Sequence, residues 1–516
     1  MRWTVIVALV SCVAIGIIIA IVLKRAEPIL KGRIEETIAA RTGGRATLDS
    51  LHVSLLRGLQ ISGEGLRIYS GVADNTQARP LIAVAHFSFR SGVIGLFFKP
   101  MHVHAVAVTG LQIEISPHNQ QQLQSSRPKG KIKIAVDEIL CQDSRLVIEA
   151  SRPDKDPRIF ELQRIELHDF GPSRPWQYKA VLKNAVPRGE IHSAGSFGPL
   201  EMNDPGSSFV SGHYTFSHAD LSPIKGIGGI LSSVGDFQGQ LARITVDGTT
   251  ETPNFSLDTA NHPVPLHTRF HAIVDGTNGD TYLEPVQAKL GDSDFTVRGQ
   301  VVDIKGRGHR IELDADIRDA RIQDSLSLAI KTQPPVMTGT IHMKAKLGID
   351  PGPESVTSKL HITGQFTVAD IHFSNPKVED KVDMLSLRAQ GKPQEAKPGA
   401  PDVRSQIQGE VQTVTGVLQF NRLVYELPGA RVDLTGRYSL DGQQFDFRGD
   451  VFTNASLRKM VASPWASALL APISPFFKAK GGGAKIPVSI TGTHGEPKFG
   501  LNLFGRDDKT KSNPQR

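Results

Sequence analysis

Two histidines in the segment Met-His-Val-His have the residue type and spacing that suit metal chemistry. His102 and His104 are two positions apart, so on a strand both imidazoles lie on the same face. Imidazole nitrogens bind zinc and related ions, commonly together with carboxylate or cysteine ligands. No carboxylate or cysteine set accompanies this pair at ligand spacing in the sequence. We therefore predict no metal and no cofactor.

Other catalytic patterns are incomplete. The run Gly481–Lys485 has neither the glycine spacing of a phosphate-binding loop nor a Ser or Thr after its lysine. Gly226–Gly229 follows an expected helix start instead of a strand, and no Gly-x-Ser-x-Gly elbow occurs. Asp314 and Asp316 alternate outward on a predicted strand and are interpreted as solubilising, although a glycosidase carboxylate pair stays open as an alternative. These observations predict a protein that is not an enzyme.

The elements around these residues are predicted to be strands with one apolar face. Residues 340–349 read Thr-Ile-His-Met-Lys-Ala-Lys-Leu-Gly-Ile, with an apolar residue at every second position. Such alternation puts one set of side chains on each face of a sheet, so that one face is apolar and the other is wet. The pattern recurs at 132–136, 311–317 and 486–490, which predicts a chain that is mostly β.

A residue pair ending in Gly is predicted to open many of these strands. Gly at a strand margin allows bulges and sharp bends, so the repeat predicts a sheet that curves or twists strongly. An ordinary antiparallel meander with Gly turns is the alternative. The glycines are Gly212, Gly239, Gly299, Gly339, Gly364, Gly416, Gly436, Gly449 and Gly492.

The N-terminus predicts a membrane anchor. Trp3 to Leu23 is an uninterrupted run of apolar and small residues without a charge, and about 20 such residues cross a bilayer as a helix. The run exceeds the roughly 7–15 apolar residues of a cleavable signal, which stays the alternative. Arg2 on one side and Lys24-Arg25 on the other pull in opposite directions, so charge alone leaves the topology open.

Composition narrows the class of protein. At 516 residues with 39% hydrophobic content, the chain can bury a large core, and two or three domains are expected. Cys12 lies in the predicted span and Cys141 stands alone, so no disulfide framework is possible. The net charge is +7, and the Lys and Arg residues are interleaved with Asp and Glu along the chain. This pattern favours a solvated surface over a nucleic-acid interface.

The predicted organisation has six parts. A short helix, Glu27 to Arg41, is expected after the anchor, and two Gly-rich or Pro-broken helices are expected at Leu221–Ser233 and Leu457–Phe477. The parts are an anchor (1–25), a helix with strands and a linker at Gln120–Gly130 (26–130), a central β region (131–389), a second linker (390–401), a C-terminal β module (402–505) and a disordered tail (506–516).

The chain resembles the AsmA-like family, which is related to TamB-type proteins. The resemblance rests on the order of degenerate segments more than on any one of them. Near the N-terminus it is carried by the membrane span, Thr42–Leu51 and Gly63–Ile68; in the middle by Gly195–Pro199, Ser211–Tyr214, Ala219–Leu221, Lys225–Gly229 and Thr252–Phe255; and at the end by Phe476–Phe499.

This resemblance implies a bacterial inner-membrane protein whose bulk lies in the periplasm and forms an elongated, curved, largely antiparallel β-groove for phospholipid. It also favours an N-in, C-out topology. Such a groove would hold acyl chains and support lipid transport or homeostasis between the inner and outer membranes. The residues expected to line it are Ile311, Leu313, Ala315, Ile317, Ile341, Met343, Ala345, Leu347, Phe366, Val368, Val432, Leu434, Ile486, Val488 and Ile490.

Other interpretations of the same strands stay open. These side chains could pack against each other or under helices as ordinary core. The chain could also be a non-transporting scaffold that holds outer-membrane or other envelope proteins at its sheet edge. A sandwich or solenoid that binds envelope glycan fits less well, because aromatic residues make up only 6% of the chain.

Overall fold

A computed structural model gives the fold. The residues it describes are 27–29, 31–32, 34–36, 38, 45–54, 59–69, 80–92, 101–115, 134–148, 157–171, 174–199, 201, 204–224, 226–258, 260, 262–304, 307–354, 356–440, 444–463, 477–479, 482–493 and 496–501.

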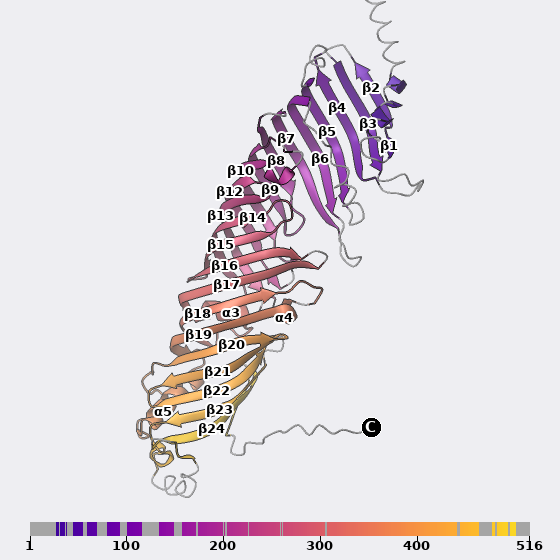
Figure 1. Ribbon diagram of the computed structural model, residues 1–516. Coiled ribbons are helices and arrows are strands. Elements are labelled where there is room, and N and C mark those ends of the chain that lie inside the picture. The colour runs from indigo at the N-terminus through magenta and orange to yellow at the C-terminus, as the bar shows by residue number, and fades with distance from the viewer. Residues whose placement is uncertain are drawn as a thin grey trace, which may run out of the picture. The chain divides into compact units, whose positions relative to one another are not determined.

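The chain divides into two compact units. Unit 1 comprises residues 1–223, 231–250 and 272–279, and unit 2 comprises residues 224–230, 251–271 and 280–516. Both are built mainly from long strands with a few short helices, which confirms the predicted mostly β class (Figure 1). The predicted linker at 390–401 lies inside unit 2, and the strands on either side of it are paired with each other.

Unit 1 is a sheet whose strands follow chain order. From β3 to β10 each strand pairs with the next; all of these pairs are antiparallel except β5 with β6, which is parallel. β3 also pairs with both β1 and β2. The strands are β1 (Arg45–Thr47), β2 (Ser50–Ser54), β3 (Leu59–Tyr69), β4 (Ile82–Ser91), β5 (Met101–Ile115), β6 (Ile134–Ile148), β7 (Arg158–Phe170), β8 (Trp176–Lys183), β9 (Arg188–Phe197) and β10 (Phe209–Asp220), with the 3-10 helix η2 (Pro205–Ser207) before β10.

The predicted helix at Glu27–Arg41 is confirmed for its described residues, which are helical within 27–38. Its acidic side chains hold the first strands: Glu35 Oε1 accepts a hydrogen bond from the Leu48 N–H at 2.7 Å, and Glu27 Oε1 accepts one from the Val53 N–H at 3.1 Å. These bonds satisfy one backbone donor between β1 and β2 and one within β2.

The predicted membrane span, Trp3 to Leu23, lies outside the described residues. Within the described part of the chain, no helix is both long enough and apolar enough to cross a membrane.

The helix predicted at Leu221–Ser233 is wrong. This segment is a turn followed by β11 (Ile227–Gly228) and the start of β12 (Ile230–Gln240), and β11 pairs with Ser256 and Leu257 of β13 (Arg243–Leu257). Three glycines within four positions disfavour a helix, and Gly229 adopts a φ of +127° that a helix does not allow. Together with β14 (Val264–Val274), these strands complete the middle of the chain.

Unit 2 continues as an antiparallel ladder in chain order. Each strand from β15 to β25 pairs with the next. The strands are β15 (Thr281–Leu290), β16 (Ser293–Ile304), β17 (Gly308–Arg321), β18 (Met337–Ile349), β19 (Leu360–Phe373), β20 (Gln406–Val414), β21 (Val417–Leu427), β22 (Ala430–Ser439), β23 (Gln444–Thr453), β24 (Ala484–Thr493) and β25 (Pro497–Leu501).

Short helices lie in the connections between strands of this ladder, in a region where the sequence predicts strands and turns. They are α3 (Ile322–Ala329), α4 (Val356–Lys359) and α5 (Pro376–Ala389). The start of α5 carries ordinary capping signals, because the Asn375 side chain accepts a hydrogen bond from the Lys377 N–H at 3.0 Å and Pro376 occupies the first turn. Of the predicted broken helix at Leu457–Phe477, residues 457–460 form the 3-10 helix η3, and 464–476 lie outside the described residues.

Several glycines predicted to open strands lie inside them instead. Gly364, Gly436 and Gly449 are interior residues of β19, β22 and β23. Their role is close approach: a Cβ on Gly449 would come within 1.8 Å of the Asp433 carbonyl oxygen on the neighbouring strand. Gly at these positions lets the backbone pack where any side chain would collide.

Candidate functional site

All fifteen residues predicted to line a groove lie in unit 2, on one face of β17 to β24. The strand register groups most of them into three rows that run across the strands. The inner row is Ala320, Ile341, Val368, Ile407, Tyr425, Val432, Val451 and Ile486; the middle row is Phe295, Ile317, Met343, Phe366, Gly409, Leu423, Leu434, Gly449 and Val488; the outer row is Leu313, Leu347 and Ile362 followed by Leu418, Tyr438 and Phe445.

The remaining predicted residues fall between or beyond these rows on the same face. Ala315 pairs with Ala345 between the middle and outer rows. Ile490 pairs with Phe447, and Ile311 pairs with Ile349 beyond the outer row. The fifteen residues chosen by the period-two pattern therefore share one face, although they lie on five separate strands, β17, β18, β19, β22 and β24.

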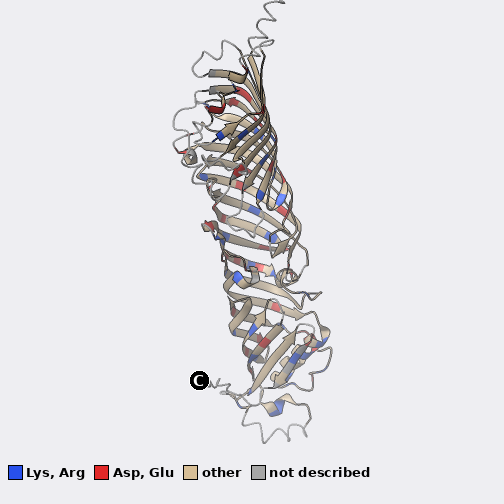
Figure 2. Cartoon of the chain, turned by 90° about the vertical axis from the view of Figure 1, so that its right-hand side faces the viewer, with Lys and Arg blue, Asp and Glu red and all other residues tan. Residues whose placement is uncertain are grey.

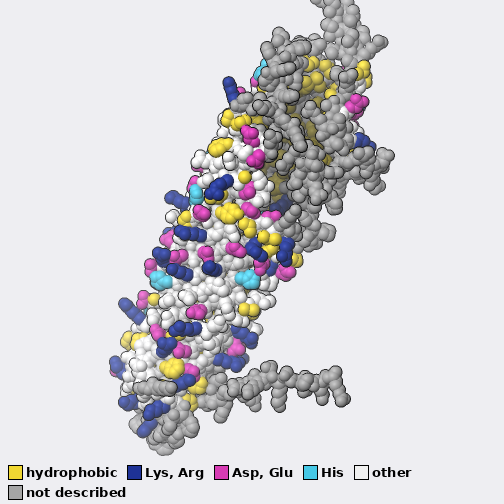
Figure 3. All heavy atoms as spheres, in the orientation of Figure 1, with side chains coloured by type: hydrophobic (Ala, Val, Ile, Leu, Met, Phe, Trp, Pro, Cys, Tyr) yellow, Lys and Arg dark blue, Asp and Glu magenta, His cyan; other side chains and the backbone are white. Residues whose placement is uncertain are grey.

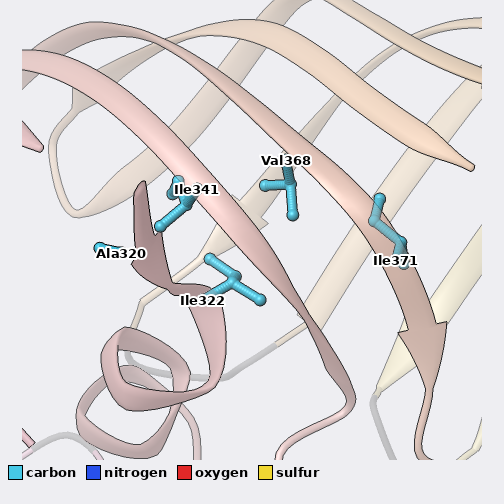
Figure 4. Packing of buried hydrophobic residues seen from close by; sticks show 5 residues of the cluster. All are labelled: Ala320, Ile322, Ile341, Val368 and Ile371. Atoms are coloured by element: carbon cyan, nitrogen blue, oxygen red, sulfur yellow. The ribbon is translucent and has the colours of Figure 1, made fainter. Parts of the chain in front are cut away.

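The inner row is buried beneath helices. Ile341 and Val368 are 5% and 3% exposed, and Ile322 and Leu326 of α3 pack against them. Figure 4 shows Ile322, at the start of the helix, close to the strands that carry Ile341 and Val368. The buried residues of this row are ordinary core, as one of the alternative interpretations expected, whereas Ile407, Tyr425 and Ile486 of the same row are half-buried.

α5 and η3 cover the inner row farther along the sheet. Val382 of α5 and Tyr425 pack against the same buried cluster, which is Ala389, Leu427 and Ala430. Leu385 of α5, Leu457 of η3 and Ile486 pack against a second cluster, which is Ala455, Met460 and Ala484. Burial raises the pKa of Tyr425 to about 12, which places its phenol in an apolar environment.

The outer row is half-buried along its whole length. Leu313, Leu347 and Ile362 pair directly across β17, β18 and β19, and all three are half-buried. Beyond Thr413, which accepts a hydrogen bond from the Ile362 N–H, the row continues through half-buried Tyr438, whose pKa burial raises to about 12. Leu313, Leu347 and Ile362 therefore keep contact with solvent that Ile341 and Val368 have lost.

Phe420 and Phe447 lie next to the middle row, and their rings continue a series of aromatic contacts that begins at Phe366 in that row. Phe366 lies edge-on to Phe420 with ring centroids 6.2 Å apart, and Phe420 lies 5.6 Å from Phe447. Glycines lie beside these rings, because Phe366 pairs with Gly409, and Gly436 pairs with both Phe420 and Phe447. Aromatic rings beside glycines on paired strands are an arrangement that stabilises β-sheets.

The opposite face of the same strands is charged. Lys344 pairs with Asp316, and Asp314 pairs with both Arg298 and Lys346. Lys, Arg, Asp and Glu are interspersed over these strands (Figures 2 and 3). Hydrogen bonds from Nε–H and Nη2–H of Arg318, the shortest at 2.6 Å, hold the pKa of the Asp316 carboxyl below its ordinary value. Asp314 and Asp316 thus lie within the solvated charge pattern.

A surface depression of about 1400 Å³ is lined mainly by this polar face. Only Ala315 and Ala345 among the fifteen predicted residues line it. Its charged residues include Arg298, Lys344 and Lys346, which the sequence analysis assigned to solvent.

A carboxylate from a neighbouring strand lies beside the two histidines of the Met-His-Val-His segment. Asp137 of β6 lies against both His102 and His104 of β5, so the expectation that no carboxylate accompanies them is wrong. The three residues meet because β5 and β6 are parallel, and no local signal in the sequence distinguishes this pairing from the antiparallel one found elsewhere.

Comparisons with known proteins add no relative. A scan against family models and searches of curated proteins and of solved structures found no match to this chain.

Proposed function

We propose that the apolar face of unit 2 binds phospholipid acyl chains and that the protein supports lipid transport or homeostasis in a bacterial envelope. The observation that carries this proposal is the outer row, where the half-buried apolar side chains of Leu313, Leu347 and Ile362 pair across three adjacent strands beside the buried Ile341 and Val368. Each acyl methylene buried on such a strip gains about 0.8 kcal/mol. A chain of several methylenes would therefore be held firmly.

The N-terminal sequence supports the choice of lipid as the ligand. The uncharged run from Trp3 to Leu23 is long enough to anchor the chain in a bilayer, where acyl chains are the abundant apolar ligand. The resemblance to the AsmA-like family supports an inner-membrane location for that anchor and a periplasmic location for the strands. The charged opposite face then keeps the sheet in water while its apolar face contacts lipid.

The direct test is photocrosslinking of the full-length chain in cells. A photoreactive phenylalanine analogue replaces Leu347 in the outer row, and in a matched variant it replaces the adjacent Lys346, which points to the other face. Lipid adducts at Leu347, and none at Lys346, are the expected result. Mass spectrometry of the adduct identifies the headgroup.

A second measurement uses purified protein. Phe366→Asp and Leu313→Asp put a charge on the apolar face and should lower the phospholipid extracted per chain, whereas Gln365→Asp and Thr363→Asp on the polar face should leave it unchanged. Lipid around the anchor is the same in all four variants. Equal lipid content in all of them, or protein adducts in place of lipid adducts at Leu347, would instead favour the scaffold alternative.

A further inference from the structure

The parallel pairing of β5 and β6 in unit 1 brings two imidazoles and one carboxylate together on the surface. Val103 pairs with Val136 and Ala105 with Glu138, which sets His104 beside Asp137. Asp137 Oδ1 lies 2.9 Å from His102 Nε2, and Asp137 Oδ2 lies 3.0 Å from His104 Nδ1. The imidazole rings are 5.3 Å apart between centroids and nearly perpendicular.

We propose that His102, His104 and Asp137 form a binding site for a divalent transition-metal ion of the zinc class. One ligand atom from each residue lies within 4.8 Å of the other two, so small side-chain rotations bring all three to the roughly 2.0–2.2 Å bond lengths that zinc requires. Two neutral imidazole nitrogens and one carboxylate oxygen are a ligand set that this class of ion prefers over calcium or magnesium.

The backbone makes the cluster well suited to hold an ion. His102 and His104 are fixed on one face of a 15-residue strand, and Asp137 is fixed on the strand beside it. The Ser91 hydroxyl donates a hydrogen bond to the His102 carbonyl at 2.7 Å, which ties β5 to the end of β4. Ligands on neighbouring strands keep their spacing better than ligands on loops.

The site is open on its outer side. The side chains of His102, His104 and Asp137 are 40%, 60% and 51% exposed. Three protein ligands on an exposed face leave at least one coordination position for water or for a ligand atom from a partner. The proposed site is therefore of the open type, in contrast to a closed four-ligand structural site.

Asp137 contacts two imidazoles, which distinguishes this cluster from the two surface pairs His213–Asp236 and His342–Asp319. His213 pairs with Asp236 at 3.0 Å, and His342 lies 3.5 Å from Asp319, each a single imidazole beside a single carboxylate. A single His–Asp pair supplies two ligands only. These pairs provide controls for weak, nonspecific binding.

The test measures zinc on the purified full-length chain. After removal of metal with a chelator, the protein is dialysed against low micromolar Zn²⁺, and zinc per chain is measured by mass spectrometry. We expect about one equivalent more in the wild-type chain than in His102→Ala, His104→Ala or Asp137→Ala. Each substitution should weaken affinity at least about 100-fold, since even the loss of an outer-shell partner costs 10–100-fold.

The controls make the assignment specific. His213→Ala should retain the equivalent, and Co²⁺ in place of Zn²⁺ should give a visible absorption spectrum that the three site variants lose. Circular dichroism checks that the variants are folded. We expect them to fold, because the substituted side chains are exposed. A wild-type chain that binds no excess zinc, or an equivalent that survives Asp137→Ala and His102→Ala, overturns the proposal.

Discussion

Phe447 lies against Gly436, its direct partner on the neighbouring strand, so closely that a Cβ on Gly436 would come within 2.4 Å of Phe447 Cδ1 and 2.5 Å of the Asp446 carbonyl oxygen. The close approach packs the ring onto the backbone of β22. The middle of the apolar face depends on this contact.

Gly436→Ala should destabilise unit 2 by about 1–3 kcal/mol, because the added methyl forces β22 and β23 apart. The measurement is the free energy of unfolding in urea. Gly348→Ala is the matched control, since its nearest neighbour, His361 Cβ, would lie at an ordinary 3.7 Å. Equal stability of the two variants would show that the strands relax without cost.

Ile371→Ala should cost about 2–5 kcal/mol in unit 2, because the side chain is 1% exposed within the cluster that α3 covers and its removal leaves a cavity. Thermal unfolding followed by circular dichroism measures the change. Ile230→Ala removes the same atoms from a residue that is 40% exposed and should cost far less. A similar loss at both sites would argue against tight packing around Ile371.

Trp176 provides a test in unit 1. Its ring lies 4.3 Å from Phe170 and 5.4 Å from Phe197 between centroids, and its indole N–H donates a hydrogen bond to the Gly171 carbonyl at 2.9 Å. Trp176→Ala should destabilise the unit by about 3–5 kcal/mol. Trp176→Phe should keep most of the packing, lose the hydrogen bond and remove a blue-shifted component of the fluorescence. A red-shifted component lost instead would mean that Trp176 is solvated.

Asp383 should make unit 2 sensitive to pH. Its carboxyl is 2% exposed, and burial, together with the neighbouring Glu379 and Asp402, raises its pKa above the ordinary 3.8. The folded protein then keeps the proton at a pH where the unfolded chain has lost it. Stability from this group is present below the unfolded pKa and is lost as pH rises through the folded pKa.

Asp383→Asn should remove this pH dependence, because an amide does not titrate in this pH range. The variant should stay folded, because the amide oxygen can still accept the hydrogen bond that the Val403 N–H donates at 3.0 Å. Relative to wild type, the variant should gain stability as pH rises from about 4 towards neutrality. Asp319→Asn, at a side chain that is 82% exposed, should leave the profile unchanged. A wild-type profile that runs parallel to that of Asp383→Asn would contradict the assignment.

Much of the strand pattern can be predicted from the sequence because it is local. The alternating segments 311–317, 340–349 and 486–490 were predicted as strands, and they lie within β17, β18 and β24. Alternation also placed all fifteen apolar residues on one face, since side-chain direction in a strand depends only on position along it. The helix predicted for the Gly-rich segment Leu221–Ser233 was wrong, because a short apolar run is compatible with either a helix or a strand.

The sequence by itself determined that one face of these strands is apolar and the other charged. Only the tertiary structure decided that Ile341 and Val368 are core beneath α3 while Leu313 and Leu347 stay half-buried, because that depends on where the helix between β17 and β18 comes to lie on the sheet. It also decided that Asp137 meets His102 and His104. Strand pairing is a long-range choice between many registers, and alternation, with its period of two, carries no information about which strand becomes the neighbour.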